Sequence, residues 1–152
     1  MANNKNLFKN ILTLLIAIIL IIFLYKVYGF TEIFIAYSFL VVLLIIIAII
    51  DIKEKIIPNK IIILGMIIGT IFLFINKEIS ILSRVFGALI SGGMLAGISV
   101  LTRGALGMGD AKLASMIGLF VGLWDIMATM FLASIASGIV GIFLIIKDRN
   151  NK

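Results

Sequence analysis

Charged residues are rare in this sequence, and they separate long apolar runs that contain none. A helix needs roughly 17–25 mostly apolar residues to cross the hydrocarbon core of a bilayer. The fifth run is short, ends beside Asp125, and reaches that length only if its helix begins near Asp110 or Ala111. The pattern predicts an all-α, polytopic membrane protein, a single membrane-embedded domain over residues 1–152. Its six spans are expected at about residues 10–25, 33–50, 59–75, 85–102, 111–124 and 126–146.

The composition agrees with a membrane protein and excludes several other classes. Hydrophobic residues make up 63% of the chain, charged residues make up 13%, and the mean hydropathy is +1.32. Soluble domains average about 45–50% apolar and about 25% charged residues. Cysteine and histidine are absent, which excludes disulfides, Cys/His metal sites and imidazole catalysis. We therefore expect no metal and no organic cofactor.

Lysine and arginine are distributed unevenly between the two predicted sides of the membrane. Only Lys26, Lys77 and Arg84 fall on one side. The other ten of the thirteen fall on the side that holds both termini: Lys5, Lys9, Lys53, Lys55, Lys60, Arg103, Lys112, Lys147, Arg149 and Lys152. Short cytoplasmic loops are enriched in Lys and Arg, so both termini are expected in the cytoplasm and the chain in the cytoplasmic (inner) cell membrane. The net charge of +6 then reports orientation and attraction to anionic lipid, and no nucleic-acid partner is needed.

The last four predicted spans carry small residues four positions apart, a spacing that the first two lack. Such pairs let helix backbones approach closely in a bilayer, where the hydrophobic effect cannot drive helices together. They therefore indicate a packed interior built from the later spans. The pairs are Gly65 with Gly69, Gly93 with Gly97, Gly118 with Gly122, Ser134 with Gly138, and Ser137 with Gly141.

Two of the seven acidic residues lie at the predicted cytoplasmic boundary of a span. Asp51 follows the apolar run of the second span, and Asp110 opens the fifth span behind a glycine-rich turn. A carboxylate at this depth is costly to bury unless it is paired or used. Either acid alone is equally well explained as a loop residue that marks a helix end.

The segment after Asp51 contains a helix-start signal. Pro58 lacks a backbone donor and suits the first turn of a helix, so the third span is expected to begin at Pro58 or Asn59. Glu54 lies between the acid and the proline and is also a candidate contact for a basic ligand.

The segment around Asp110 is rich in glycine. Gly107 and Gly109 flank Met108 directly before the acid, and Lys112 follows two residues later. Glycine adopts backbone angles closed to other residues and lets another chain approach closely. A bare Gly-x-Gly-Asp is a weak signal because glycine–aspartate turns are common. Two flanked acids at one membrane face are a stronger signal.

These two segments resemble the motifs of the type IV prepilin peptidase family, the membrane aspartic proteases of the Gly-x-Gly-Asp class. The first family motif is an aspartate followed seven residues later by proline. Asp51 and Pro58 match it, with Asn59 where many relatives have aspartate. The second motif is Gly-x-Gly-Asp followed by Lys-Leu, which residues 107–113 match. The resemblance extends over about residues 33–146.

The resemblance implies that Asp51 and Asp110 are the catalytic pair of an aspartic endopeptidase of pilus biogenesis and protein secretion. Its substrate would be a prepilin-like membrane protein with a short basic leader, cut at the cytoplasmic face just before its hydrophobic helix. Glu54 is then a candidate contact for that leader. Longer family members carry an additional region with paired cysteines and methylate the new N-terminus. This chain is similar to the short, peptidase-only form, so we expect no N-methylation.

Two other functions remain open from the residues alone. Intramembrane carboxylates also form proton relays, which fits an ion-coupled transporter, although both acids are expected at one face. A non-catalytic membrane subunit of a pilus or secretion assembly would use the aspartates only as helix-end markers.

The helix ends predict different roles for the two acids. Asp110 is expected at a helix N-terminus, where free backbone donors favour negative charge. Asp51 is expected at a helix C-terminus, where the helix dipole disfavours negative charge. We therefore expect Asp110 to be mainly the ionised base and Asp51 mainly the proton holder.

Overall fold

The computed structural model of the protein describes residues 2–104 and 106–149. These residues form six α-helices and no strand, which confirms the predicted all-α class. The helices are α1 (Ala2–Tyr28), α2 (Glu32–Glu54), α3 (Asn59–Ile75), α4 (Ile81–Leu101), α5 (Met108–Val121) and α6 (Leu123–Arg149).

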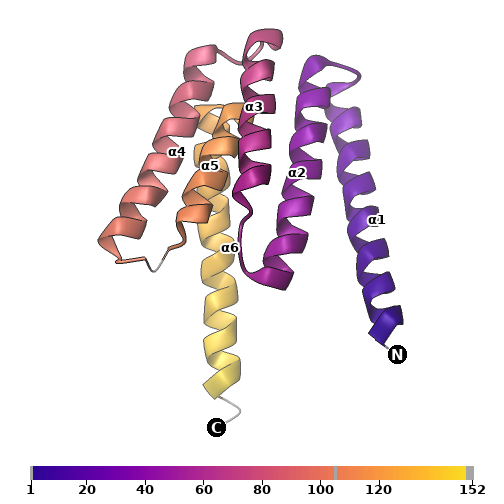
Figure 1. Ribbon diagram of the computed structural model, residues 1–152, viewed down its shortest axis with the longest axis vertical. Coiled ribbons are helices and arrows are strands. Elements are labelled where there is room, and N and C mark those ends of the chain that lie inside the picture. Colours follow the sequence, from indigo (N-terminus) through magenta and orange to yellow (C-terminus); the bar gives the residue numbers. More distant parts are fainter. Residues whose placement is uncertain (1, 105, 150–152) are drawn as a thin grey trace.

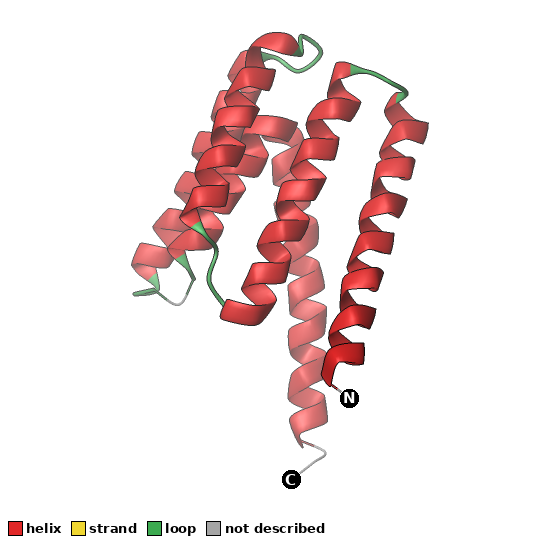
Figure 2. Cartoon of the chain, turned by 45° about the vertical axis from the view of Figure 1, so that its right-hand side comes forward, coloured by secondary structure: helices red, strands yellow, loops and turns green. Residues whose placement is uncertain are grey.

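The helices lie side by side and alternate in direction along most of the chain (Figures 1 and 2). Figure 1 shows α1 at one edge beside α2, α4 at the opposite edge, and α5 between α3 and α4. The α2–α3 and α4–α5 connections lie at the same end as the two chain termini. We call this the basic end, because its connections and adjoining helix turns carry Lys53, Lys55, Lys60, Arg103 and Lys112.

Within the described residues, three helices are long and apolar enough to cross a membrane by length and composition: α2, α4 and the Leu123–Lys147 part of α6. Two shorter apolar segments, Leu12–Tyr28 and Asn59–Ile75, accompany them. α5 has only 14 residues, which at 1.5 Å per residue is about 21 Å, short of a hydrocarbon core of about 30 Å. The structure therefore supports a membrane protein, while a complete crossing by all six helices stays a prediction.

α5 is the central helix of the bundle, with contacts to α2, α3, α4 and α6. Met116 and Phe120 on α5 are completely buried. They join residues of α2 and α3 in one apolar cluster: Ala36, Leu40, Ile47, Ile62 and Phe72. α1 contacts only α2 among the described helices, and most of its large apolar side chains from residue 12 onward are exposed, as expected of a lipid-facing helix.

Glycines let α5 pack closely between its neighbours. A Cβ on Gly118 would lie 2.5 Å from the carbonyl carbon of Gly87 on α4, so the two backbones touch there. On the α3 side, Gly65 leaves room for Met116, and a Cβ on Gly69 would lie 3.0 Å from the Phe120 ring. This is the small-residue packing expected between helices in a bilayer.

The other small-residue pairs do not contribute to this interior. A Cβ added at Gly93, Gly97, Gly138 or Gly141 would meet no atom within 4 Å. The spacing of small residues therefore identified the packed face of α3 but not that of α4. α4 instead packs on α5 through Gly87, Ser91 and Gly92, which were not among the pairs named from the sequence.

The boundary between the fifth and sixth helices differs from the predicted one. The prediction placed it beside Asp125, but α5 ends at Val121 and α6 begins at Leu123. Gly122 between them has φ 85° and ψ 178°, a backbone conformation that only glycine adopts easily. Asp125 therefore belongs to the first turn of α6, where the free N–H groups of a helix start favour a negative charge.

The sequence placed Arg84 just outside the fourth span, on the outer side, but the structure places it within α4. α4 begins at Ile81, which places Arg84 in its first turn, and only 1% of the arginine is exposed. Its Nη1 donates to the carbonyl oxygen of Phe72, 3.1 Å away, in the last turn of α3. A buried cation at the negative end of a helix explains why this arginine lies inside the bundle.

We expect Gly118→Ala to destabilise the protein by about 1–3 kcal/mol, because the new methyl group forces α5 away from the Gly87 backbone. Gly138→Ala on the exposed face of α6 is the matched control. It is expected to be neutral or to stabilise by about 0.5–1 kcal/mol, since alanine is the better helix former. Unfolding in mixed micelles measures both, and a Gly118→Ala protein as stable as the wild type would contradict this packing.

Candidate active site

Asp51 lies in the last turn of α2, which ends three residues later. The backbone N–H of Lys55 donates to the Asp51 carbonyl oxygen at 2.8 Å. Lys55 itself has φ 54° and ψ 34°, the left-handed conformation that closes many helices but is uncommon for a residue other than glycine. The chain therefore turns sharply just after the acid and leads directly into the α2–α3 connection.

α3 begins one residue after Pro58, which takes the position directly before the helix. The Pro58 carbonyl oxygen accepts hydrogen bonds from the N–H groups of Ile61 and Ile62. Asn59, the first residue of α3, accepts a hydrogen bond at its Oδ1 from Nζ of Lys112, 3.0 Å away. This bond joins the first motif to the second across 53 residues of sequence.

Asp110 lies in the first turn of α5, which begins at Met108. Its backbone N–H donates to the Gly107 carbonyl oxygen at 3.1 Å. A Cβ on Gly107 would lie 3.3 Å from Oδ2 of Asp110, so the carboxylate lies back over this glycine. A Cβ on Gly109 would lie 3.2 Å from Cβ of Ile57, in the α2–α3 connection. Gly107 thus leaves room for the Asp110 carboxylate, and Gly109 leaves room for Ile57 of the first motif.

The connection before this turn is fastened to the end of α4. Ser99 donates from Oγ to the Leu106 carbonyl oxygen at 2.6 Å. Gly104, with φ 89°, donates from its N–H to the Ser99 carbonyl oxygen at 2.8 Å. Ser99 is 3% exposed, so these bonds hold the residues before the glycine-rich turn against a buried side chain near the end of α4.

Both aspartates line one cavity of about 350 Å³ at the basic end. Asp51 comes from α2 and Asp110 from α5, and both side chains are exposed, so water reaches each of them. Two carboxylates in one hydrated cavity can act as an acid and a base on the same molecule. The cavity is lined by Asp51, Lys55, Ile56, Ile57, Asn59, Gly107, Gly109, Asp110 and Lys112.

Three other residues singled out in the sequence lie near this cavity but do not line it. Pro58 is half-buried at the start of α3. Met108 lines a neighbouring apolar groove together with Lys112. Glu54 is the exposed last residue of α2, on the basic end but outside the cavity wall.

Three lining residues were not anticipated: Lys55, Ile56 and Ile57. The fixed seven-residue spacing between Asp51 and Pro58 was the available signal, because the residues inside that spacing must form the turn between the two helices. Nothing in the sequence marks Lys55 as left-handed, since that conformation belongs to glycine far more often.

The described residues contain no group of three or more Asp, Glu, His or Cys side chains arranged to hold a metal ion. The polar groups that line the cavity are the two carboxylates, the ammonium group of Lys112, the amide of Asn59 and the backbone of the glycine-rich turn.

The fold and the cavity define an all-helical membrane protein with two acids from distant motifs at one end of its bundle. The sequence model of the Type IV leader peptidase family matches residues 38–142. This match covers more than half of the 152 residues, and the chain belongs to that family, which is a family of proteases. No curated protein and no solved structure matches the chain.

We expect the double variant Ile57→Cys/Gly109→Cys to form an intramolecular disulfide under mild oxidation. The two Cβ positions are 3.2 Å apart in this structure, and a small shift brings them to the usual disulfide separation of about 3.5–4.5 Å. The chain has no native cysteine, so a thiol-sensitive shift in electrophoretic mobility reports this bond alone.

Ile57→Cys/Gly97→Cys is the matched control, because Gly97 lies near the same end of the bundle with no atom within 4 Å of its Cβ position. Equal disulfide yields in the two double variants would contradict the contact between the two motifs.

Proposed function

We propose that the protein is a membrane aspartic endopeptidase that removes the short basic leader of type IV prepilin-like proteins at the cytoplasmic membrane face. Asp51 and Asp110 are its catalytic residues, and it does not methylate the product. Membership of the Type IV leader peptidase family supports proteolysis. The observation that carries the aspartic mechanism is the shared cavity, which receives one acid from each motif.

Peptide hydrolysis by two carboxylates needs one ionised and one protonated group. The ionised carboxylate takes a proton from water while the water oxygen attacks the scissile carbonyl carbon, and the protonated carboxyl donates its proton to the carbonyl oxygen. The C–N bond of the tetrahedral intermediate then breaks as the leaving nitrogen receives a proton.

The helix ends support an order within the pair. Asp110 is in the first turn of α5 and Asp51 in the last turn of α2. A helix start favours negative charge and a helix end disfavours it, by about 0.3–1 kcal/mol at exposed sites. In the proposed mechanism Asp110 accordingly takes the proton from water, and Asp51 donates one to the carbonyl oxygen. Lys112 adds positive charge on the Asp110 side of the cavity.

The glycine-rich turn provides the backbone surface for an extended substrate. Gly107 and Gly109 both line the cavity, and the absence of side chains there leaves backbone atoms accessible to a peptide. Glu54, at the exposed end of α2, is available to a basic leader that approaches from the cytoplasm.

The chain passes through the inner membrane six times, with both termini in the cytoplasm and with the short α5 enclosed by neighbouring helices. The arrangement of the bundle supports this topology, since the termini and the two basic connections lie at one end (Figure 1). The distribution of Lys and Arg supports the orientation. The cavity with the two acids then faces the cytoplasm, where the leader of a prepilin is exposed.

We expect Asp51→Asn and Asp110→Asn each to lower kcat/KM for cleavage of a purified type IV prepilin by about 10²–10⁴-fold. Each substitution removes one half of the acid–base pair and leaves the side-chain size unchanged. The measurement is the rate of leader removal by the full chain in proteoliposomes.

Asp125→Asn is the matched control, because Asp125 is an exposed acid in the first turn of α6, at the opposite end of the bundle. It should retain wild-type cleavage. A protein that cuts equally well without either cavity acid is not an aspartic protease of this site. A non-catalytic subunit never cuts, and a transporter shows ion-dependent flux instead.

We expect a membrane-impermeant maleimide to label Lys77→Cys in intact cells and Lys53→Cys only after permeabilisation. Both residues are exposed, and they lie at opposite ends of the bundle, after α3 and near the end of α2. The cysteine-free chain serves as the unlabelled control. Labelling of Lys53→Cys in intact cells would reverse the orientation and remove the cavity from the cytoplasm.

A further inference from the structure

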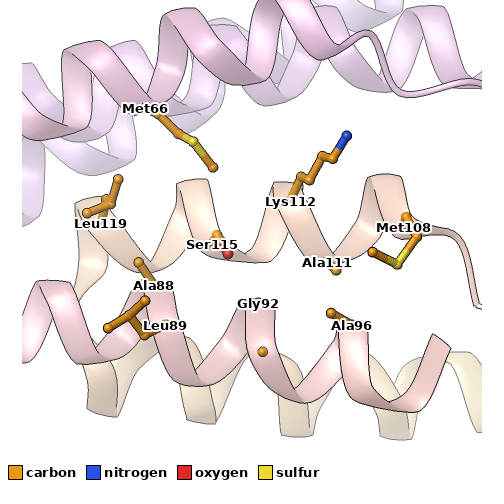
Figure 3. A pocket seen from close by; sticks show the side chains of 11 residues that line it. Met66, Ala88, Leu89, Gly92, Ala96, Met108, Ala111, Lys112, Ser115 and Leu119 are labelled. Atoms are coloured by element: carbon orange, nitrogen blue, oxygen red, sulfur yellow. The ribbon is translucent and has the colours of Figure 1, made fainter. Parts of the chain in front are cut away.

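A second cavity lies directly beside the candidate active site. It has a volume of about 490 Å³ and is formed by α3, α4 and α5. Figure 3 shows its wall: Ala96, Ala111 and Met108 at one end, near Lys112, and Leu89 and Leu119 at the other end. We call it the α4–α5 groove. The residues that line it are otherwise apolar or small, with Ser115 and Lys112 as its polar members.

The α4–α5 groove adjoins the active-site cavity at Lys112, which lines both. Its Nζ is bonded to Asn59 in the active-site wall. From Ala96 back to Leu89 the groove follows α4 for seven residues, about 10 Å along the helix axis. The groove thus begins next to the active-site cavity and runs away from the basic end, along the direction of the helices.

Gly93 is a groove residue that the fold of this chain does not require. A Cβ at Gly93 would meet no atom within 4 Å, although the neighbouring Gly92 is packed against Ser115. A glycine inside a helix costs roughly 0.5–1 kcal/mol relative to alanine. In a bilayer such a residue suits a position where another helix backbone comes close. No atom of the described bundle lies within 4 Å of a Cβ at Gly93, so the groove is open at this position.

We propose that the α4–α5 groove holds the hydrophobic helix of the substrate, on the membrane side of the bond that is cut. The inference rests on the proposed function and names where that substrate is held. A substrate that is cut just before its hydrophobic helix must place the bond at the aspartates and the helix directly beside them. The groove is an apolar surface that adjoins the active-site cavity and extends from it in this direction.

The composition of the groove suits side chains of varied shape. Met66 and Met108 bring flexible, polarizable side chains that adapt to irregular apolar surfaces. Ala88, Ala96 and Gly93 keep the α4 wall low, which permits a close helix–helix approach. The volume accommodates several side chains from about two turns of a helix rather than a whole helix. A groove of this kind selects for a hydrophobic helix in general and not for one sequence.

The first test is a photo-crosslink from the groove to the substrate. A benzophenone amino acid replaces Leu89 in the full-length Asp110→Asn chain, which holds a type IV prepilin without cutting it. We expect a crosslink to the hydrophobic segment of the prepilin, identified by mass spectrometry. The same probe at Ile139, an exposed residue of α6, is the control and should give none.

Absence of the Leu89 crosslink, in a preparation whose wild-type parent cuts the prepilin, overturns the proposal. A crosslink from Leu89 to a second copy of this chain or only to lipid overturns it as well. If the wild-type parent does not cut the prepilin, the proposed function fails instead, so the two failures are distinguishable.

The second test compares a whole prepilin with a soluble peptide that spans its cleavage site and lacks the helix. We expect Gly93→Leu to lower kcat/KM for the prepilin at least about tenfold more than for the peptide, chiefly through KM, because the leucine fills the groove. Gly138→Leu adds the same bulk to an exposed glycine with no atom within 4 Å of its Cβ position, and should leave both rates unchanged. Equal losses on the two substrates, or no loss on either, contradict the proposal, and a Gly93→Leu chain that does not fold leaves the decision to the Leu89 crosslink.

Discussion

Close packing of α5 between α3 and α4 is the constraint on which the site depends. α5 is short, and it carries Asp110 on its first turn. Its backbone touches that of α4 at Gly118 and Gly87, and its Met116 side chain lies against Gly65 of α3. These contacts fix where α5 begins. The turn before Asp110 then meets the α2–α3 connection through Gly109 and Ile57, and the Lys112–Asn59 bond ties the two together.

The buried arginine shows how the opposite end of the bundle is held. Arg84 donates a hydrogen bond to the carbonyl oxygen of Phe72, in the last turn of α3. Phe72 also belongs to the apolar cluster that includes Phe120 of α5. Arg84 therefore links α4 directly to α3 and, through the apolar cluster, to α5. These are the three helices that also pack together at the glycines. α3, α4 and α5 are therefore held together near both ends of the bundle, and the exposed acids lie at the basic end of this packed unit.

Hydrophobic patterning predicted most of the fold, because apolar runs separated by charges are a direct consequence of the bilayer as a solvent. All six helices lie where runs were recognised, and α3 matches residues 59–75. The α5–α6 boundary was misplaced because the charge of Asp125 was a more visible signal than the backbone conformation of Gly122. Arg84 was assigned to a loop because the sequence does not reveal which carbonyl group a charged side chain will reach. The two acids were recognisable from their motifs, whereas their common cavity, and Lys55 in its wall, required the packing of α5.

In the mechanism that we propose, Asp51 and Asp110 act as one catalytic unit within this cavity. Groups that act as a unit do not lose activity additively, since removal of one member already abolishes the work of the other. The most direct measurement is kcat/KM for prepilin cleavage by Asp51→Asn, Asp110→Asn and the double variant. If the two aspartates act as one unit, the double variant is expected to be no slower than the slower single variant. Losses that multiply in the double variant, or full activity in either single variant, would contradict it.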